Sequence, residues 1–229
     1  MHTAVYRTGR VTHAFFDKTG TLTKQGLDFL KARSLTGSTE YNDRLLQYAM
    51  SVCHSLTPSS DGRLIGNPVD HAMFCASGAC LISSSLQTGT VIQVKSRERL
   101  ATVRHFEFDH HRMTQSVVVQ VDVTDGPTKF FAIAKGSGES VKSLCLPNTI
   151  PTNFAEELLQ SASAGIYQIS VAYKTLPSGT DRAAVANMSR ADLESDLNFL
   201  GVLDFQNIMR LETEDVIRQL SAGGVVSSM

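Results

Sequence analysis

The strongest constraint on this 229-residue chain is an apolar run that ends abruptly at an acid. Residues 11–16 are mostly β-branched, apolar or aromatic, and the seven residues D-K-T-G-T-L-T follow them at positions 17–23. Such a change predicts a buried strand that gives way to a loop. In open α/β sheets, ligands bind at the carboxyl ends of strands. We therefore expect Asp17 to lie at a ligand site.

The residue types in this heptad suit phosphoryl chemistry. A carboxylate such as that of Asp17 can attack a phosphoryl group and become an aspartyl phosphate. Gly20 lets backbone N–H groups approach phosphate oxygens closely, and the neighbouring hydroxyl groups add donors. An isolated Asp-Lys-Thr-Gly would more often be a polar turn without chemistry. The unbroken heptad argues for the chemical interpretation.

The heptad matches the phosphorylation motif of the P-type ATPases, a family that this chain resembles. The resemblance implies that Asp17, Lys18 and Thr19 are catalytic and that Asp17 takes the γ-phosphoryl group of ATP. It also implies that Mg²⁺ binds at Asp17 and Thr19. The related haloacid-dehalogenase enzymes often carry a second Asp where this chain has Thr19. Its absence implies slow hydrolysis of the phosphoenzyme.

The resemblance also implies a fold class and a domain organisation. The class is α/β: an α+β nucleotide-binding domain with an antiparallel sheet, inserted in an incomplete haloacid-dehalogenase-like phosphorylation domain. The implied parts are residues 1–30 (phosphorylation domain), 31–197 (nucleotide-binding domain) and 198–229 (return hinge and part of the phosphorylation domain). The family's later Thr-Gly-Asp and Gly-Asp-Gly-x-Asn-Asp motifs do not occur in these residues. We therefore expect the chain alone not to autophosphorylate.

Composition narrows the classes of function. There are 21 basic and 22 acidic residues, for a net charge of −1, so no nucleic-acid partner is expected. No window approaches the about 18–20 apolar residues of a membrane span, and the first residues lack a signal-peptide core. Because P-type ATPases are membrane pumps, the resemblance implies a cytosolic domain of an integral membrane protein. Its partners would be ATP or ADP and the transporter's transmembrane and actuator domains.

Periodicity and turn residues predict helices and strands between these motifs. Helices are expected at residues 40–56, 153–164, 189–197 and 212–220. Strands are expected at residues 101–108, 116–123, 129–134, 167–174 and 199–204. Asn67 predicts the N-cap of a further helix that begins at Pro68. Residues 58–62 and 83–90 predict loops, and residues 125–127 predict a hairpin turn.

The four cysteines, Cys53, Cys75, Cys80 and Cys145, lack the spacing of a zinc site and have apolar neighbours. This pattern predicts free, buried thiols in a reducing compartment.

Two segments resemble the family's adenine-binding residues. Residues 66–70 resemble a Gly-x-Pro-x-acid segment, which implies that Asp70 accepts a hydrogen bond from the adenine amino group. Phe108 matches the family's adenine-stacking Phe, a contact worth ~1–3 kcal/mol. Each pattern also has a purely structural interpretation. Asp70 would belong to a capped amphipathic helix, and Phe106 and Phe108 would be same-face strand residues in a core.

The segment from Lys135 to Glu139 resembles the family's Lys-Gly-Ala-Pro-Glu motif, which implies that Lys135 and Gly136 line the nucleotide pocket. Tyr167 stands where the family commonly has a phosphate-contacting arginine, and a second basic residue falls near Arg112 or Met113. The resemblance to the return hinge implies that Asp204 and Arg210 approach the nucleotide. Tyr167 in place of the arginine, and a second basic residue that falls near Arg112 or Met113, predict weak phosphate affinity.

The Gly-Leu-Asp at positions 26–28 resembles the fifth P-type subfamily, particularly its group B. The resemblance therefore implies a segment of an ATP-driven pump for a cation or a polyamine. Two alternatives remain open: a free-standing haloacid-dehalogenase-type phosphatase and a non-catalytic nucleotide-binding module.

Overall fold

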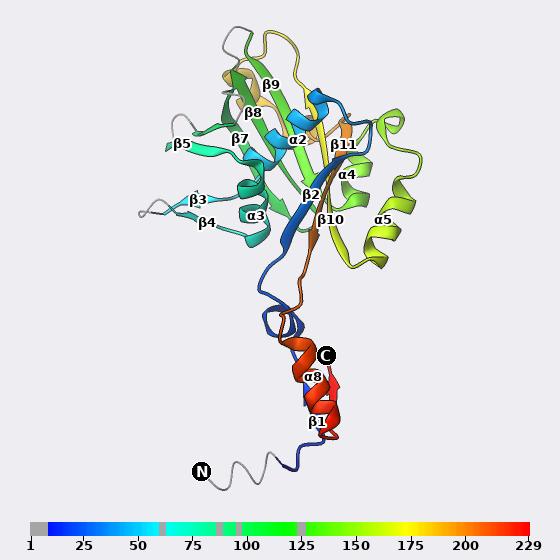
Figure 1. The fold of residues 1–229 in the computed structure, drawn as a ribbon. Helices are drawn as coiled ribbons and strands as arrows, with labels where there is room; N and C mark the ends of the chain where they lie inside the picture. Colours follow the sequence, from blue (N-terminus) through cyan, green and yellow to red (C-terminus); the bar gives the residue numbers. More distant parts are fainter. Residues whose placement is uncertain (1–8, 60–62, 86–88, 95–97, 123–126) are drawn as a thin grey trace. The chain divides into compact units, whose positions relative to one another are not determined.

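A computed structural model describes residues 9–59, 63–85, 89–94, 98–122 and 127–229 (Figure 1). The chain forms two compact units, of which the smaller comprises Met1–Asp28 and Gln206–Met229 and the larger comprises Phe29–Phe205. The larger unit extends past residue 198, and the smaller unit resumes at Gln206. The reason is that strand β11 (Asn198–Gln206) is hydrogen-bonded into the sheet of the larger unit.

The smaller unit contains a pair of short parallel strands, β1 (His13–Phe15) and β12 (Val226–Ser228), with His13 opposite Val226. Helix α8 (Thr213–Ala222) precedes β12. The strand expected at 11–16 is present, but the expectation that it is buried is wrong, since Phe15 is 79% exposed. Within the described residues, β12 is the strand that pairs with β1, and His13 and Phe15 at the two ends of β1 are exposed.

The larger unit is built on an eight-stranded sheet in the order β2-β11-β10-β9-β8-β7-β6-β5. Neighbouring strands from β5 to β10 pair antiparallel. The mixed α/β class with a central antiparallel sheet is therefore confirmed. Besides β11, the strands are β2 (Asp28–Ser34), β5 (Cys80–Ser85), β6 (Gly89–Gln93), β7 (Arg99–Asp109), β8 (Thr114–Asp122), β9 (Lys129–Gly136) and β10 (Ile166–Thr175).

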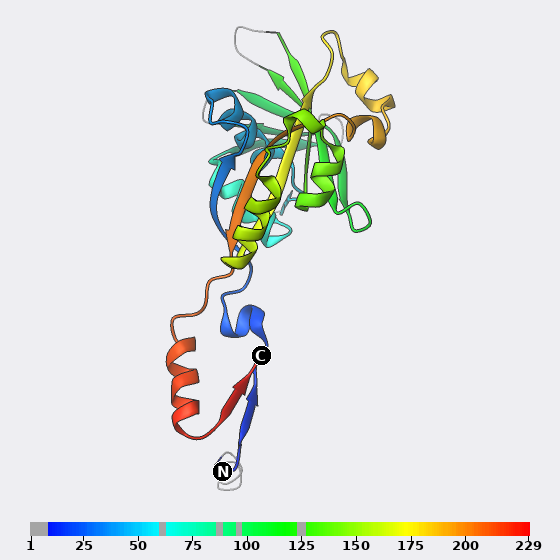
Figure 2. The same ribbon diagram turned by 90° about the vertical axis from the view of Figure 1, so that its right-hand side faces the viewer.

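Helices cover both faces of this sheet, as the two views of the larger unit show (Figures 1 and 2). Successive side chains of a strand point to opposite faces, so β9 defines both. Phe131 lies near Tyr48 of α2, with ring centroids 6.3 Å apart. Ala134 packs on the other face, in a cluster with Val141 and Phe154. The helices of the first face are α2 (Glu40–Val52) and α3 (Pro68–Ser77), and those of the second are α4 (Gly138–Leu144) and α5 (Phe154–Ser163).

The remaining elements of the larger unit are short. Helices α6 and α7 pack on the second face through Val185 and Leu193, in a cluster with Val118 and Ala132. A small hairpin stands apart from the main sheet. These elements are α6 (Arg182–Asn187), α7 (Arg190–Leu193), the 3-10 helix η2 (Pro147–Thr149), and the hairpin strands β3 (Thr57–Pro58) and β4 (Leu64–Ile65).

The structure corrects several local expectations. The loop expected at 83–90 is wrong where it is described, because β5 continues to Ser85 and β6 begins at Gly89, while residues 86–88 lie outside the described residues. Residues 60–62 and 125–126 of the expected loop and turn also lie outside them. All four thiols are free, but Cys75 and Cys80 are exposed.

None of the described helices combines the length and the apolar character that a membrane crossing requires.

Candidate nucleotide site and phosphorylation loop

The larger unit contains a cavity of about 410 Å³ on the α2 and α3 side of its sheet. Its walls come from the start of α3, the β7–β8 hairpin, the end of β9 and the start of β10. Its volume lies within the about 300–1,000 Å³ of small-molecule pockets. The lining residues are Ser55, Asn67, Val69, Asp70, Phe108, His110, Met113, Gln115, Lys135, Gly136, Ser137, Tyr167 and Ile169.

Asp70 reaches the cavity because of the local helix start that the sequence predicts. Asn67 caps α3, its Oδ1 accepting from the Val69 N–H at 2.9 Å, and Pro68 is the first helical residue. Asp70 then lies in the first turn and is only 6% exposed. Its Oδ1 forms an ion pair with Lys135 Nζ, and its Oδ2 accepts from the Ser55 N–H at 3.1 Å.

Lys135 and Gly136 are the last two residues of strand β9, where Lys135 supplies a buried charge and Gly136 allows a close backbone contact. Lys135 pairs in the sheet with Gln115 and is 5% exposed, so its ammonium depends on Asp70 for charge compensation. A Cβ on Gly136 would lie 2.2 Å from the Met113 carbonyl oxygen. Glycine therefore lets β9 approach the β7–β8 hairpin closely.

A register shift in β7 turns Phe108 toward the cavity. The pairing of β7 with β8 is irregular between Phe106 and Asp109. Phe106 packs against the α6–α7 cluster with the Arg104 guanidinium 4.8 Å from its ring centroid, whereas Phe108 lines the cavity and is 42% exposed. The interpretation of both rings as same-face core residues is therefore wrong, because a bulge adds a residue and rotates the strand.

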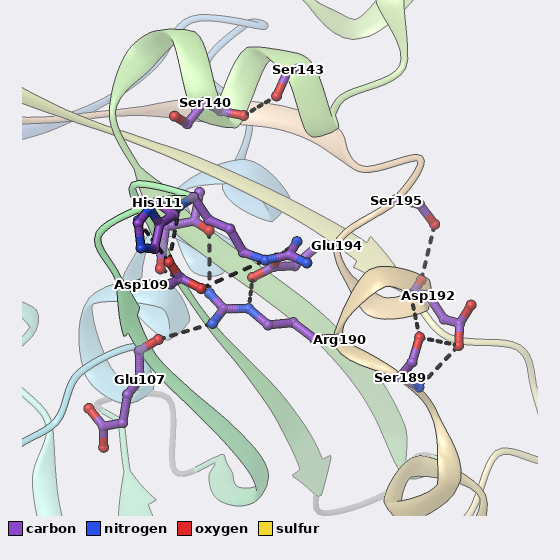
Figure 3. Close-up of polar contacts among 12 residues, drawn as sticks. Glu107, Asp109, His111, Ser140, Ser143, Ser189, Arg190, Asp192, Glu194 and Ser195 are labelled. Carbon is purple, nitrogen blue, oxygen red and sulfur yellow. Dashed lines mark hydrogen bonds and ion pairs between the residues drawn. The ribbon is translucent and has the colours of Figure 1, made fainter.

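The hairpin that carries Phe108 is fixed by an ion network around the buried Glu194 (Figure 3). Arg190 donates to Glu194 at 2.8 Å, to the Glu107 carbonyl at 3.2 Å and to the Thr114 carbonyl at 2.9 Å. Glu194 is 2% exposed and also accepts from Arg112 at 3.4 Å. Arg112 is thus engaged outside the cavity, which it does not line.

A polar network that includes the cavity-lining residues Ser55 and Gln115 was not predicted from the sequence. The Ser55 hydroxyl donates to Glu107 at 2.5 Å, and Gln115 Nε2 donates to Ser55 at 2.8 Å and contacts His105 Nε2 at 3.0 Å. Burial lowers the pKa of His105, which favours the neutral ring that accepts from Gln115. These residues come from three separate segments, so spacing alone carries no signal for the network.

Asp204 lies on the other face of the sheet from the cavity. Its fully buried carboxylate pairs with Arg33 at 2.7 Å and accepts from Gln168 at 2.9 Å. Gln168 alternates in β10 with Tyr167 and Ile169, which line the cavity, so Gln168 and Asp204 face away from it. The implied approach of Asp204 to the nucleotide therefore does not fit this geometry.

In the smaller unit, Asp17 ends the segment after β1 and begins an irregular turn, η1 (Lys18–Leu22). Asp17, Lys18 and Thr19 are exposed, and Asp17 makes no side-chain capping hydrogen bond. Gly20 adopts φ +88°, a conformation that favours glycine. The heptad thus forms the expected loop with its carboxylate accessible.

Arg210 holds this loop from the returning segment. Its guanidinium donates to the Gly20 carbonyl at 2.9 Å and to the Thr23 carbonyl at 3.3 Å. The buried Thr23 hydroxyl closes the turn by donating to the Lys18 carbonyl at 3.1 Å. The structure thus places Asp17, Lys18, Thr19 and Arg210 in one unit, and Asp70, Phe108, Lys135 and Gly136 around the cavity of the other.

The smaller unit offers a partial fit to Mg²⁺. Asp17 supplies one carboxylate and Thr19 a hydroxyl and a carbonyl, and oxygen is the ligand that Mg²⁺ prefers. Among the described residues, no group of three His, Cys, Asp or Glu side chains is placed to hold a metal ion. Mg²⁺ commonly binds through one or two carboxylates, with phosphate and water oxygens completing its shell, and Asp17 fits that role.

Comparison with known proteins finds relatives among transporting ATPases. No family model matches the chain. The chain is 32% identical to the probable cation-transporting ATPase 13A4 of Gallus gallus, over 96% of its length and 20% of that protein. It is 31% identical to the human probable cation-transporting ATPase 13A5, over 96% of its length, and to the human polyamine-transporting ATPase 13A2, over 93%. It spans about a fifth of the length of each.

Proposed function

Because this chain belongs to the P-type ATPase family and to its fifth subfamily, we propose that its larger unit binds an adenine nucleotide. We further propose that Asp17 receives the γ-phosphoryl group in the whole protein, which uses the phosphoenzyme to transport a cation or a polyamine. The chain would then lie on the cytosolic side of the membrane and work with the transporter's transmembrane and actuator domains.

The observation that carries the proposal is the convergence of Asp70, Phe108 and Lys135 on one cavity. The Phe108 ring offers a face on which a base can stack. Asp70 uses one lone pair of each oxygen for Lys135 and Ser55, and a carboxylate has about four such acceptor sites. Asp70 can therefore accept a further hydrogen bond from the amino group of adenine.

The chemistry at Asp17 follows from its exposed carboxylate. One carboxylate oxygen attacks the γ-phosphorus, the bond to the β–γ bridging oxygen breaks, and ADP leaves with that electron pair. Mg²⁺, when bound, would neutralise charge on the phosphate oxygens. Arg210 keeps the loop in shape through Gly20 and Thr23. Thr19, unlike an Asp, provides no acid or base for the water that would hydrolyse the aspartyl phosphate.

Calorimetric titration of the 229-residue chain with ATP tests the binding step. We expect saturable binding that Phe108→Ala weakens by about 5- to 100-fold, the loss of one stacking contact. Phe15→Ala is the matched control, since Phe15 is an exposed ring in the other unit. Equal ATP affinity in the Phe108 variant, or no saturable binding at all, would show that the cavity is not a nucleotide site.

Labelled ATP with Mg²⁺ tests the phosphoryl-transfer step. In the longer protein we expect a label that survives acid, is released by hydroxylamine and disappears with Asp17→Asn. On these 229 residues alone we expect no label, because the family's later motifs are absent from them. A hydroxylamine-labile label that persists in the Asp17→Asn protein would place the nucleophile elsewhere.

One observation supports a second function, a nucleotide-binding module without catalysis: the cavity lies wholly within the larger unit and needs no residue of the Asp17 loop. ATP binding that is unaffected by Asp17→Asn fits both functions, so the labelling experiment decides between them. The free-standing phosphatase predicts turnover of p-nitrophenyl phosphate by the chain, which Thr19 argues against.

A further inference from the structure

We infer that the cavity recognises the base of its nucleotide, that the phosphates contribute little affinity, and that Tyr167 is a second stacking residue that causes this preference. The inference rests on the proposed function and concerns how the same cavity distributes its binding energy. Three features of the lining residues support it.

The first feature is the charge balance of the cavity. Asp70 and Lys135 are the carboxylate and ammonium groups among its described lining residues, and they are paired with each other. Their exposed fractions of 6% and 5% leave little of either charge facing the cavity. A polyphosphate entering here would meet no uncompensated lysine or arginine. It would also have to compete with a buried carboxylate for Lys135.

The second feature is the set of contacts that the Arg112 side chain makes. Arg112 lies in the same hairpin as Phe108, but its guanidinium contacts Glu194 at 3.4 Å and Asp109 at 3.8 Å. Glu194 is 2% exposed and is also held by Arg190, so releasing Arg112 would weaken the network that fixes the hairpin. Arg112 is therefore not available to bind phosphate without cost to the site.

The third feature is the apolar and aromatic character of the remaining wall. Tyr167 and Phe108 line the cavity and are 54% and 42% exposed, so part of each ring is free to contact a ligand. Val69, Met113 and Ile169 add apolar surface. Such a wall suits a flat, uncharged ring system, because aromatic stacking does not depend on charge. In the sequence, Tyr167 stands where the resemblance to the family implies a phosphate-contacting arginine.

Calorimetry with adenosine, AMP, ADP and ATP tests the inference on the 229-residue chain. We expect the four dissociation constants to agree within about threefold and to change little with salt, because few charges contact the ligand. Tyr167→Leu should weaken adenosine and ATP by the same factor, about 5- to 100-fold. Tyr167→Phe should bind both ligands with wild-type affinity, because it keeps the aromatic ring.

A substitution that adds a positive charge at position 167 should increase the affinity for ATP. Tyr167→Arg should bind ATP more tightly than adenosine by about tenfold or more, and salt should reduce that difference, because the new contact is between a guanidinium and phosphate. Tyr41→Leu is the matched control. Tyr41 has a similar exposed fraction, 46%, but does not line the cavity, so its loss should change no affinity.

The outcomes separate the two proposals. Wild-type binding of ATP at least tenfold tighter than adenosine would overturn this inference and leave the proposed function standing. The same would follow if Tyr167→Leu weakened ATP without weakening adenosine. If neither ligand bound the correctly folded chain, as judged by its circular dichroism, both proposals would fail.

Discussion

The ion pair between Asp70 and Lys135 makes a prediction about stability. Asp70→Asn keeps the side-chain volume and an acceptor for the Ser55 N–H, but it leaves the ammonium of Lys135 without a partner. Removing one partner of a buried pair costs about 3–5 kcal/mol. For a unit of this size, about 2–4 °C is lost per kcal/mol, so the melting temperature should fall by about 6–20 °C.

A double-mutant cycle isolates the pair from other effects of substitution. Lys135→Met should also destabilise the protein, since it leaves the Asp70 carboxylate buried at 6% exposure. The double variant carries neither charge, so it should lose at least about 1 kcal/mol less than the sum of the single losses. Urea denaturation followed by circular dichroism gives the three free energies of unfolding.

An exposed pair provides the control for this cycle. Glu214 and Arg218 contact each other at 2.8 Å, with side chains 75% and 68% exposed. Their coupling should be only about 0.3–0.5 kcal/mol, because water screens both charges. If the Asp70 and Lys135 losses add to within about 0.5 kcal/mol, the two groups do not compensate each other. The argument for a charge-neutral cavity would then fail with them.

Three further predictions concern other contacts. Gly136→Ala should destabilise the larger unit by about 1–3 kcal/mol in urea denaturation, because its Cβ would meet the Met113 carbonyl oxygen at 2.2 Å. Arg210→Met should speed amide exchange in the 17–23 loop by about tenfold, as hydrogen bonds worth about 1 kcal/mol are lost. Burial lowers the pKa of His54, so the urea concentration at the unfolding midpoint should decrease when the pH is lowered from 7.5 to 5.5.

The sign of the pH effect follows from the protons bound in each state. An unfolded histidine takes up a proton near about pH 6.5, whereas the folded His54 does so only at lower pH. The unfolded state therefore binds more protons in this range, and stability is lost as pH falls. The folded geometry agrees, since the His54 ring accepts the Leu56 N–H at 3.2 Å through Nδ1. His54→Gln should flatten the slope.

The Gly136 and Arg210 predictions each have a matched control variant and an outcome that would contradict them. Gly223→Ala is the control for Gly136, since its nearest neighbour would be 3.4 Å away, and equal costs for both would contradict the close approach. Arg218→Met is the control for Arg210, because Arg218 contacts only exposed acids in its own unit. Unchanged loop exchange in the Arg210 variant would show that other contacts hold the heptad.

Local features of the fold were predictable from the sequence because their causes lie within a few residues. The Asn67 cap before Pro68 depends only on neighbouring residues, and it is present. The strands at 101–108, 116–123 and 129–134 are rich in apolar and β-branched residues, and each is present, although β8 is described only to Asp122. The Asp17 heptad predicted its loop for the same reason.

Other features depend on pairing between distant segments, which periodicity does not contain. The serine-rich run at 83–85 has little intrinsic strand character, yet it forms the end of β5 because β6 supplies its hydrogen bonds. The bulge between Phe106 and Asp109 is set by the register of β7 against β8, so the sequence alone could not say that the two phenylalanines point apart. The burial of Asp204 depends on Arg33 and Gln168, which lie far from it in the sequence.

The same limit applies to the charges of the site, because a motif does not show which charged groups are already paired. A motif identifies Lys135 and Arg112 as cations, but only the fold shows that a buried acid faces each of them. Two opposite unit charges 4 Å apart attract by about 4 kcal/mol near a protein surface. A phosphate must therefore compete with Asp70 for Lys135, or with Glu194 for Arg112. What the cavity offers without competition is the exposed face of two aromatic rings. Recognition through the base follows from that difference.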